Sequence, residues 1–175
     1  MAEKTRQQSS VGDPSPGKDS LVEIVPYEPR YRDDFRRLNV EWLEKYFRIE
    51  EKDNRVLIDP ETHIIDKGGF IFFARIDSDV VGTAALIKAG KGCYELSKMS
   101  VTDTHQGIGI GRKLAEAAIR CFEESSGSEL YLESNSRLTP ALTLYESIGF
   151  VRRPVPDDSQ YERADVYMVY RPRGR

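Results

Sequence analysis

The sequence predicts a single mixed α/β domain, built on a mostly antiparallel sheet with flanking helices. Residues 69–101 contain three short apolar runs separated by turn-forming residues, which is typical of antiparallel strands. From Ile110 onward the apolar residues recur at intervals of three and four, which indicates a helix. A further strand pattern at 128–135 completes a strand–helix–strand unit, so two strands of the sheet should be parallel.

Length and composition favour one domain with one core. The chain has 175 residues, 39% of them hydrophobic, and a net charge of −3. This charge argues against a nucleic-acid or anionic-membrane partner, so any anion site must be local. Residues 1–20 are polar and are expected to form a flexible tail before a domain at 21–175. The sequence contains neither a signal-peptide pattern nor an apolar run of membrane-spanning length, so we expect a soluble, cytoplasmic protein.

The N-terminal half alternates between helix and strand patterns. Residues 21–27 alternate as a short strand, and 30–47 place apolar residues at helical spacing with charges opposite. The mixed stretch 48–68 predicts a short helix and loops. The three strands of the meander are expected at 69–76, 80–87 and 93–101.

The C-terminal half should contain two helices and three strands. The helix that starts near Ile110 precedes the strand at 128–135. Thr139 as N-cap, Pro140 as first residue and Gly149 as C-cap predict a short helix at 140–148. Two more strands are expected at 150–154 and 164–171.

Three glycines at alternate positions, Gly107, Gly109 and Gly111, precede the first of these helices. They do not fit the dinucleotide fingerprint, because a sixth residue counted from Gly107 or Gly109 is not glycine. They do not fit the nucleotide-triphosphate loop either, because no Ser or Thr follows Arg112-Lys113. A turn rich in N–H groups at a helix N-terminus, with Arg112 nearby, suits a pyrophosphate. The alternative is that the glycines only permit a tight turn.

Three motifs resemble the GNAT acetyltransferase superfamily. Residues 106–111, QGIGIG, match its Gln/Arg-x-x-Gly-x-Gly/Ala signature, 95–101 resemble its fourth strand, and 141–150 resemble its second conserved motif. The resemblance extends over residues 69–151. It implies a GNAT-like sheet whose parallel central strands, 93–101 and 128–135, splay apart to admit the pantetheine arm of acetyl-CoA. The residues it implies for acetyl-CoA binding are Met99, Ser100, Val101, Gln106, Gly107, Ile108, Gly109, Ile110, Gly111, Arg112, Asn135 and Tyr145.

The strand at 93–101 changes the phase of its apolar residues. Tyr94 and Leu96 lie on one phase, Met99 and Val101 on the other. This pattern indicates either a β-bulge or a slip in a half-exposed strand, and the resemblance favours the bulge. A bulge frees backbone groups, and an N–H near Met99 to Val101 could polarise a thioester carbonyl.

The resemblance places a general acid at Tyr145, in the pattern Leu-Tyr-x-x-x-Gly-Phe; the alternative is a core aromatic residue. Glu95 is the candidate base, with Glu133 or a water molecule as alternatives. Cys93 and Cys121 lie in no nucleophile or zinc pattern, so neither a covalent cysteine step nor a metal is expected.

The predicted function is direct acetyl transfer from acetyl-CoA to a primary amine of a small metabolite, an amino acid, a peptide or a protein. The alternative is a non-catalytic acyl-CoA sensor, which would bind the cofactor without turnover. Members of the superfamily are often dimers, so the resemblance allows a homodimer, although no segment of the sequence identifies an interface.

Overall fold

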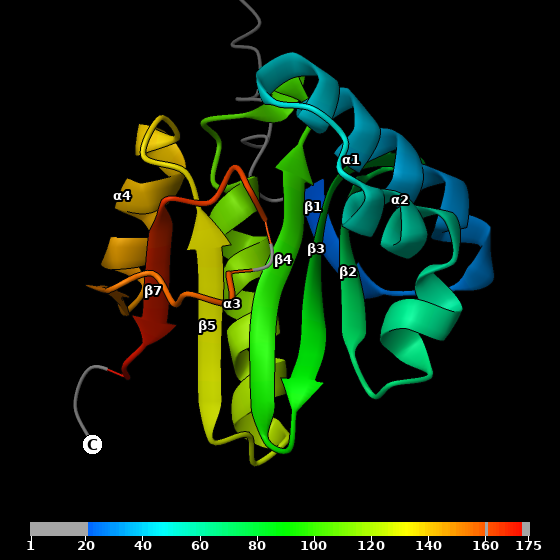
Figure 1. Cartoon of the computed structure of the whole chain (residues 1–175). Coiled ribbons are helices and arrows are strands. Elements are labelled where there is room, and N and C mark those ends of the chain that lie inside the picture. The colour runs from blue at the N-terminus through cyan, green and yellow to red at the C-terminus, as the bar shows by residue number, and fades with distance from the viewer. Residues whose placement is uncertain (1–20, 160, 173–175) are drawn as a thin grey trace, which may run out of the picture.

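A computed structural model describes residues 21–159 and 161–172; the expected N-terminal tail, residues 1–20, lies outside the described residues. Seven strands form one mixed sheet in the order β1-β2-β3-β4-β5-β7-β6, with helices on both faces (Figure 1). Within the described residues no helix has the length and apolarity needed to span a membrane. The mixed α/β sheet expected from the sequence is confirmed.

The elements follow the order predicted from the sequence. The strands are β1 (Val22–Pro26), β2 (Phe70–Ile76), β3 (Asp79–Gly90), β4 (Cys93–Val101), β5 (Glu129–Ser134), β6 (Phe150–Arg153) and β7 (Val166–Tyr170). The α-helices are α1 (Arg32–Tyr46), α2 (Glu51–Ile58), α3 (Ile110–Glu124) and α4 (Thr139–Ser147). Short helical turns are η2 (Pro29–Tyr31), η3 (Glu61–Ile65) and η4 (Asp103–His105).

The helix α4 begins one residue earlier than the sequence predicts. Leu138, not Thr139, is the N-cap, and the Leu142 N–H donates to the Leu138 carbonyl at 3.0 Å. The expected capping by Thr139 is therefore wrong: its backbone is already helical, and the fixed φ of Pro140 suits the first turn. Gly149 follows the C-cap with φ +110°, the left-handed conformation that commonly ends a helix.

Each face of the sheet carries its own apolar core. The helix α3 presents Ile110, Leu114 and Phe122 to one face, where they pack against residues of β2 to β5 and β7. The helices α1 and α2 cover the other face of β2 and β3 with side chains that include Phe35 and Leu57. The central strand β3 is therefore buried on both sides over most of its length.

The parallel strands β4 and β5 pair only at their first residues. Three residue pairs join them, from Cys93 opposite Glu129 to Glu95 opposite Tyr131, and the strands then diverge (Figure 1). The antiparallel meander of β2, β3 and β4 and the parallel arrangement of β4 with β5 are both confirmed.

The bulge expected in β4 is present. Ser97 lies opposite Ala85 and Ser100 opposite Thr83, so the β4 side of this interval holds one residue more than the β3 side. The extra residue changes which face the following side chains occupy. Tyr94 and Leu96 pack against the α3 core before the bulge, and Met99 does so after it.

Candidate active site

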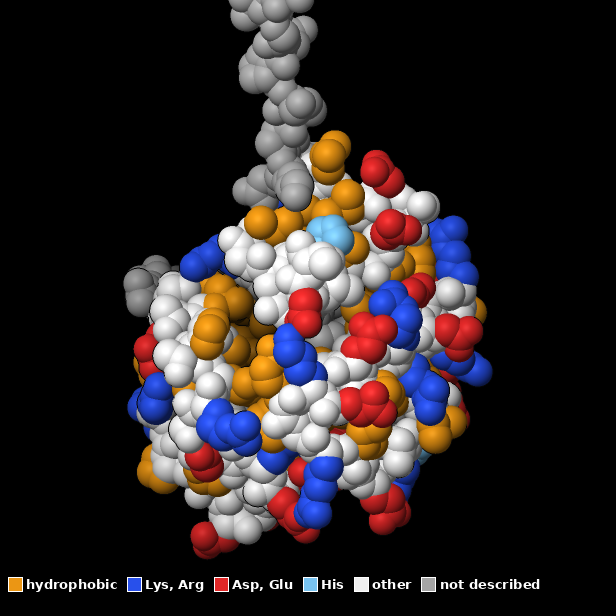
Figure 2. Space-filling model, turned by 90° about the horizontal axis from the view of Figure 1, so that it is seen from above, with side chains coloured by type: hydrophobic (Ala, Val, Ile, Leu, Met, Phe, Trp, Pro, Cys, Tyr) orange, Lys and Arg blue, Asp and Glu red, His pale blue; other side chains and the backbone are white. Residues whose placement is uncertain are grey.

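A cleft of about 760 Å³ follows the split between β4 and β5. We call its two sides the α3 half, lined from α3, α4 and residues 106–111, and the α1 half, lined from α1, α2 and residues 161–164. Seen from above, the molecule is hollowed; apolar side chains line the hollow and Lys and Arg side chains lie at its rim (Figure 2). The cleft therefore passes through the sheet and joins its two faces.

The glycine turn lies at the N-terminus of α3. Gly107 and Gly109 have φ values of +76° and +87°, a conformation that favours glycine, and Gly109 is the N-cap of the helix. The Gln106 amide fixes the start of the turn by donating to the Val101 carbonyl at 3.0 Å. The first N–H groups of a helix have no intrahelical partner, so this turn can receive an anion.

The structure brings almost all of the predicted cofactor residues to the cleft. Those that line it are Met99, Ser100, Val101, Gln106, Gly107, Gly109, Ile110, Gly111, Arg112, Asn135 and Tyr145. Ile108 is different: it is absent from the lining, and its side chain packs against the α3 core. Asn135 also joins the loop after β5 to the segment before β7, because its Nδ2 donates to the Arg163 carbonyl at 2.7 Å.

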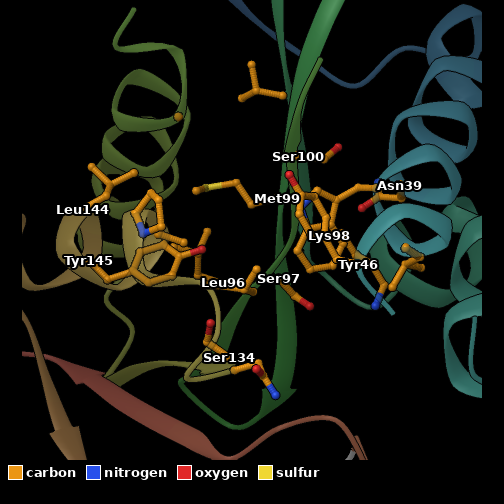
Figure 3. A pocket seen from close by; sticks show the side chains of 18 of the residues that line it. Asn39, Tyr46, Leu96, Ser97, Lys98, Met99, Ser100, Ser134, Leu144 and Tyr145 are labelled. Carbon is orange, nitrogen blue, oxygen red and sulfur yellow. The ribbon is translucent and has the colours of Figure 1, made fainter. Parts of the chain in front are cut away.

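Tyr145 projects from α4 into the α3 half, and its hydroxyl points toward the gap beside Leu96 and Met99 (Figure 3). Burial raises the pKa of Tyr145 to about 12, so the hydroxyl stays protonated at neutral pH. Its ring also packs edge-on against Phe150, with the ring centroids 6.0 Å apart. Tyr145 therefore packs its ring as a core aromatic residue does, and at the same time directs its hydroxyl into the cleft.

The carboxylates Glu95 and Glu133 line the cleft from the opposite face of the sheet. Their neighbours Leu96 and Leu132 pack against the α3 core, and successive strand residues point to opposite faces. Glu95 is only 4% exposed, and burial raises its pKa although Lys52 and Lys98 oppose that effect. The Oε2 atom of Glu133 is buried and has no hydrogen-bond partner among the described residues. Both carboxylates can therefore reach Tyr145 only through the split.

A buried ionic cluster forms the far wall of the α1 half. Asp53 is fully buried, and it accepts hydrogen bonds from Lys98 at 2.9 Å and from Arg163 at 2.8 and 3.0 Å. Burial would raise the pKa of Asp53, but the bonds from Arg163 and Lys98 outweigh it and lower the pKa to about 2. Sequence analysis missed this cluster, because its members lie at least 45 residues apart and share no motif.

Aromatic side chains of α1 and the residue after it line the same half. Trp42 contacts Tyr46 and Phe47, with ring centroids 5.6 and 5.4 Å away. Trp42 is half-buried: it packs against the core between α1 and the sheet, as helical spacing suggests, and it also lines the cleft. The Arg137 guanidinium lies 5.6 Å from the Phe47 ring centre and so joins the loop before α4 to the loop after α1.

Neither cysteine belongs to the cleft, whereas one histidine lines it. Cys93 and Cys121 are half-buried free thiols outside the lining of the cleft. His105 lines the cleft, and its Nδ1 lies 2.9 Å from the Thr102 hydroxyl. Within 21–159 and 161–172, no three His, Cys, Asp or Glu side chains gather as a metal site would require.

A split sheet, a glycine turn at the N-terminus of α3 and ionisable side chains on both faces suit a transferase that takes a long anionic donor. The sequence profile of the acetyltransferase (GNAT) family matches residues 29–150. The chain therefore belongs to this family of acetyl-CoA-dependent N-acetyltransferases.

Individual relatives agree with this membership. N-alpha-acetyltransferase RimI from Mycobacterium tuberculosis is 32% identical over 127 residues, which cover 69% of this chain and 73% of that protein. A GNAT-family acetyltransferase structure from Staphylococcus aureus superposes with a TM-score of 0.77 at 20% identity, covering 85% of this chain and 98% of that one. The structure of yncA from Salmonella typhimurium with its cofactor acetyl-CoA gives a TM-score of 0.68 at 19% identity, covering 85% and 92%.

Proposed function

We propose that the protein transfers acetyl groups directly from acetyl-CoA to the α-amine of a peptide or protein N-terminus. The observation that carries this proposal is the split itself. It places the Tyr145 hydroxyl on one face of the sheet and the Glu95 and Glu133 carboxylates on the other. A thioester in the gap would meet a proton donor from one side and an amine with its base from the other.

The α3 half fits the donor. The turn 106–111 and the N-terminus of α3 would receive the pyrophosphate, and the Arg112 side chain lies at the same end of the cleft. Beyond the turn, Met99 and Val101 offer an apolar wall and a strand edge that β5 has left. Main-chain groups on such an edge can bond the amides of the pantetheine arm.

The amine must lose a proton before it attacks the thioester carbonyl. A peptide α-amine titrates at about 7.7–8.0, against about 10.4 for a lysine, so it is the easier nucleophile at neutral pH. Glu95 acts as base, directly or through water, and Glu133 is the alternative on the adjoining strand. As the C–S bond breaks, the Tyr145 hydroxyl donates its proton to the departing CoA thiolate.

The charges of the α1 half favour an acceptor with a neutral group beside its amine. Lys98 and Arg163 also line the cleft, but their charged groups are bonded to Asp53. The Arg137 guanidinium lies over the Phe47 ring. Glu95 and Glu133 have no cationic partner at hydrogen-bond distance among the described residues. The carboxylate of a free amino acid would therefore lie close to two other carboxylates, which is unfavourable. A peptide carries a neutral carbonyl at the same place. The name of the RimI relative, an N-alpha-acetyltransferase, supports the same acceptor class.

The test is release of CoA thiol from acetyl-CoA with a matched set of acceptors. The set contains Ala-initiated peptides, the same peptides with a blocked N-terminus and an internal lysine, and free alanine. We expect release with the open N-terminus, and little with the blocked peptide or with alanine. CoA release with the blocked, lysine-containing peptide or with free alanine, at a rate equal to that of the open peptide, would contradict the assignment of a peptide α-amine as acceptor. Tight binding of acetyl-CoA without release for any acceptor, proteins included, would support the non-catalytic sensor.

A further inference from the structure

Lys98 occupies an unusual backbone conformation at the centre of β4. Its φ is +51°, in the left-handed region that residues other than glycine seldom adopt within a strand. It lies in the bulge, where Lys98 and Met99 of β4 stand opposite the single residue Ala84 of β3. The conformation is unfavourable for a lysine unless the surrounding structure compensates for it.

The side chain of Lys98 supplies that compensation. Its ammonium donates to the Asp53 carboxylate and to the Tyr161 hydroxyl, each at 2.9 Å, and the residue is only 8% exposed. Asp53 is itself fixed, since it accepts from the Glu50 N–H at 3.0 Å and from Arg163. The ammonium is therefore anchored to α2 and to the segment that precedes β7.

This anchor determines which way the rest of β4 faces. Lys98 and Ser100 point toward α1, whereas Met99 points into the α3 half (Figure 3). In a regular strand that continued from Leu96, Lys98 and Ser100 would occupy the apolar α3 half and Met99 would face α1. A charged lysine in that apolar space is strongly disfavoured, and so is its separation from Asp53.

We propose that Lys98 is a positioning residue for the acetyl transfer. Its ion pair with Asp53 holds the bulge, and the bulge directs the main-chain N–H groups next to Met99 toward the thioester carbonyl. These groups would stabilise the oxygen as it gains negative charge. The inference rests on the proposed transfer function, but its structural part can be measured without turnover.

Two substitutions distinguish the effect of the backbone conformation at position 98 from the effect of the ammonium group. Lys98→Met keeps the length of the side chain and removes the charge, so the left-handed conformation loses its compensation. Lys98→Gly also removes the charge, but glycine adopts the left-handed conformation freely. We expect kcat to fall about 10- to 100-fold in Lys98→Met and to fall clearly less in Lys98→Gly, because glycine keeps the left-handed conformation of the bulge without the ion pair. The Kd for CoA should change little in both, because residues 106–111 are untouched.

The measurements are kcat per CoA-binding site, with binding sites counted by calorimetry, and the crystal structure of Lys98→Met. Lys88→Met, an exposed change on β3, is the matched control.

A regular β4 in the Lys98→Met crystal together with the kcat difference would support the inference. A retained bulge, wild-type kcat in Lys98→Met, or equal losses in both variants would overturn it. Equal losses would mean that the ammonium itself contacts the reactants. An inactive wild-type protein would refute the transfer function, and the crystal structure would still decide whether Lys98 holds the bulge.

Discussion

Tyr145 combines two properties that a general acid for thiolate departure needs. Its hydroxyl points into the split, and burial keeps it protonated by raising its pKa to about 12. The packing of its ring against Phe150 fixes the direction of the hydroxyl. The same packing means that the hydroxyl can be removed without disturbing the cleft.

Tyr145→Phe should therefore lower kcat about 100-fold while the Kd for CoA stays nearly constant. Steady-state kinetics with an N-terminal peptide and calorimetry with CoA measure the two quantities. Tyr167→Phe, which removes a hydroxyl outside the lining of the cleft, is the control and should keep wild-type kcat. Unchanged turnover in Tyr145→Phe would exclude this residue as the acid.

Glu95 should impose an acidic limb on the pH profile of kcat/KM. A base works in its deprotonated form, and burial raises the pKa of Glu95, so activity should fall as the pH drops through a value above the usual range of a glutamate. Glu95→Gln should remove this limb and lower kcat/KM. If the limb and the activity persist in Glu95→Gln but disappear in Glu133→Gln, Glu133 is the base.

The same substitution should stabilise the fold at neutral pH. Burial raises the pKa of the Glu95 carboxyl in the folded state above its value in the unfolded chain. Such a group lowers the free energy of unfolding as the pH rises from the unfolded-state pKa to the folded-state pKa. Glu95→Gln removes this penalty, so its melting temperature at pH 7 should exceed that of wild type. At a pH below the unfolded pKa of a glutamate, about 4.3, the difference should disappear. A lower melting temperature at pH 7 would mean that Glu95 has a favourable partner in the fold.

At the scale of elements, the turn before α3 links backbone conformation to cofactor binding. Gly109 combines a φ of +87° with the N-cap position, where the N–H groups of the helix begin. Gly109→Asp adds a side chain in a strained conformation and a negative charge where the pyrophosphate is expected. Calorimetry should detect no CoA binding. Gly90→Asp, at the last residue of β3, adds the same charge away from residues 106–111 and should bind CoA normally.

The elements that could be predicted from sequence are those with a local signal. The apolar period of α3, the glycines before it and the phase change in β4 each lie within about a dozen residues. The ionic cluster around Asp53 has no such signal, because its partners come from α2, β4 and the segment before β7. For Trp42 the sequence allows a core position or a place in the acceptor pocket, since helical spacing does not reveal whether a neighbouring element covers a side chain.

For the whole molecule, cofactor binding should appear as thermal stabilisation. A ligand at 100 times its Kd that binds only the folded state adds about 2.7 kcal/mol. For a domain of this size that corresponds to a rise in Tm of about 5–11 °C. A thermal melt with and without CoA measures the shift, and Gly109→Asp should show none. A wild-type protein without a shift at this saturation would contradict binding of CoA to the folded domain.

The two halves of the cleft are built from different parts of the chain. The α3 half is lined from α3, α4 and residues 106–111, whereas α1, α2 and residues 161–164 line the other half. Only three residue pairs of β4 and β5 join at the base of the split. We therefore expect the scaffold to be modular: α1, α2 and the segment before β7 should be exchangeable for those of a relative, provided that Asp53, Tyr161 and Arg163 are kept to anchor Lys98 and the bulge. Such a chimera should keep its cofactor and acquire the acceptor preference of the relative.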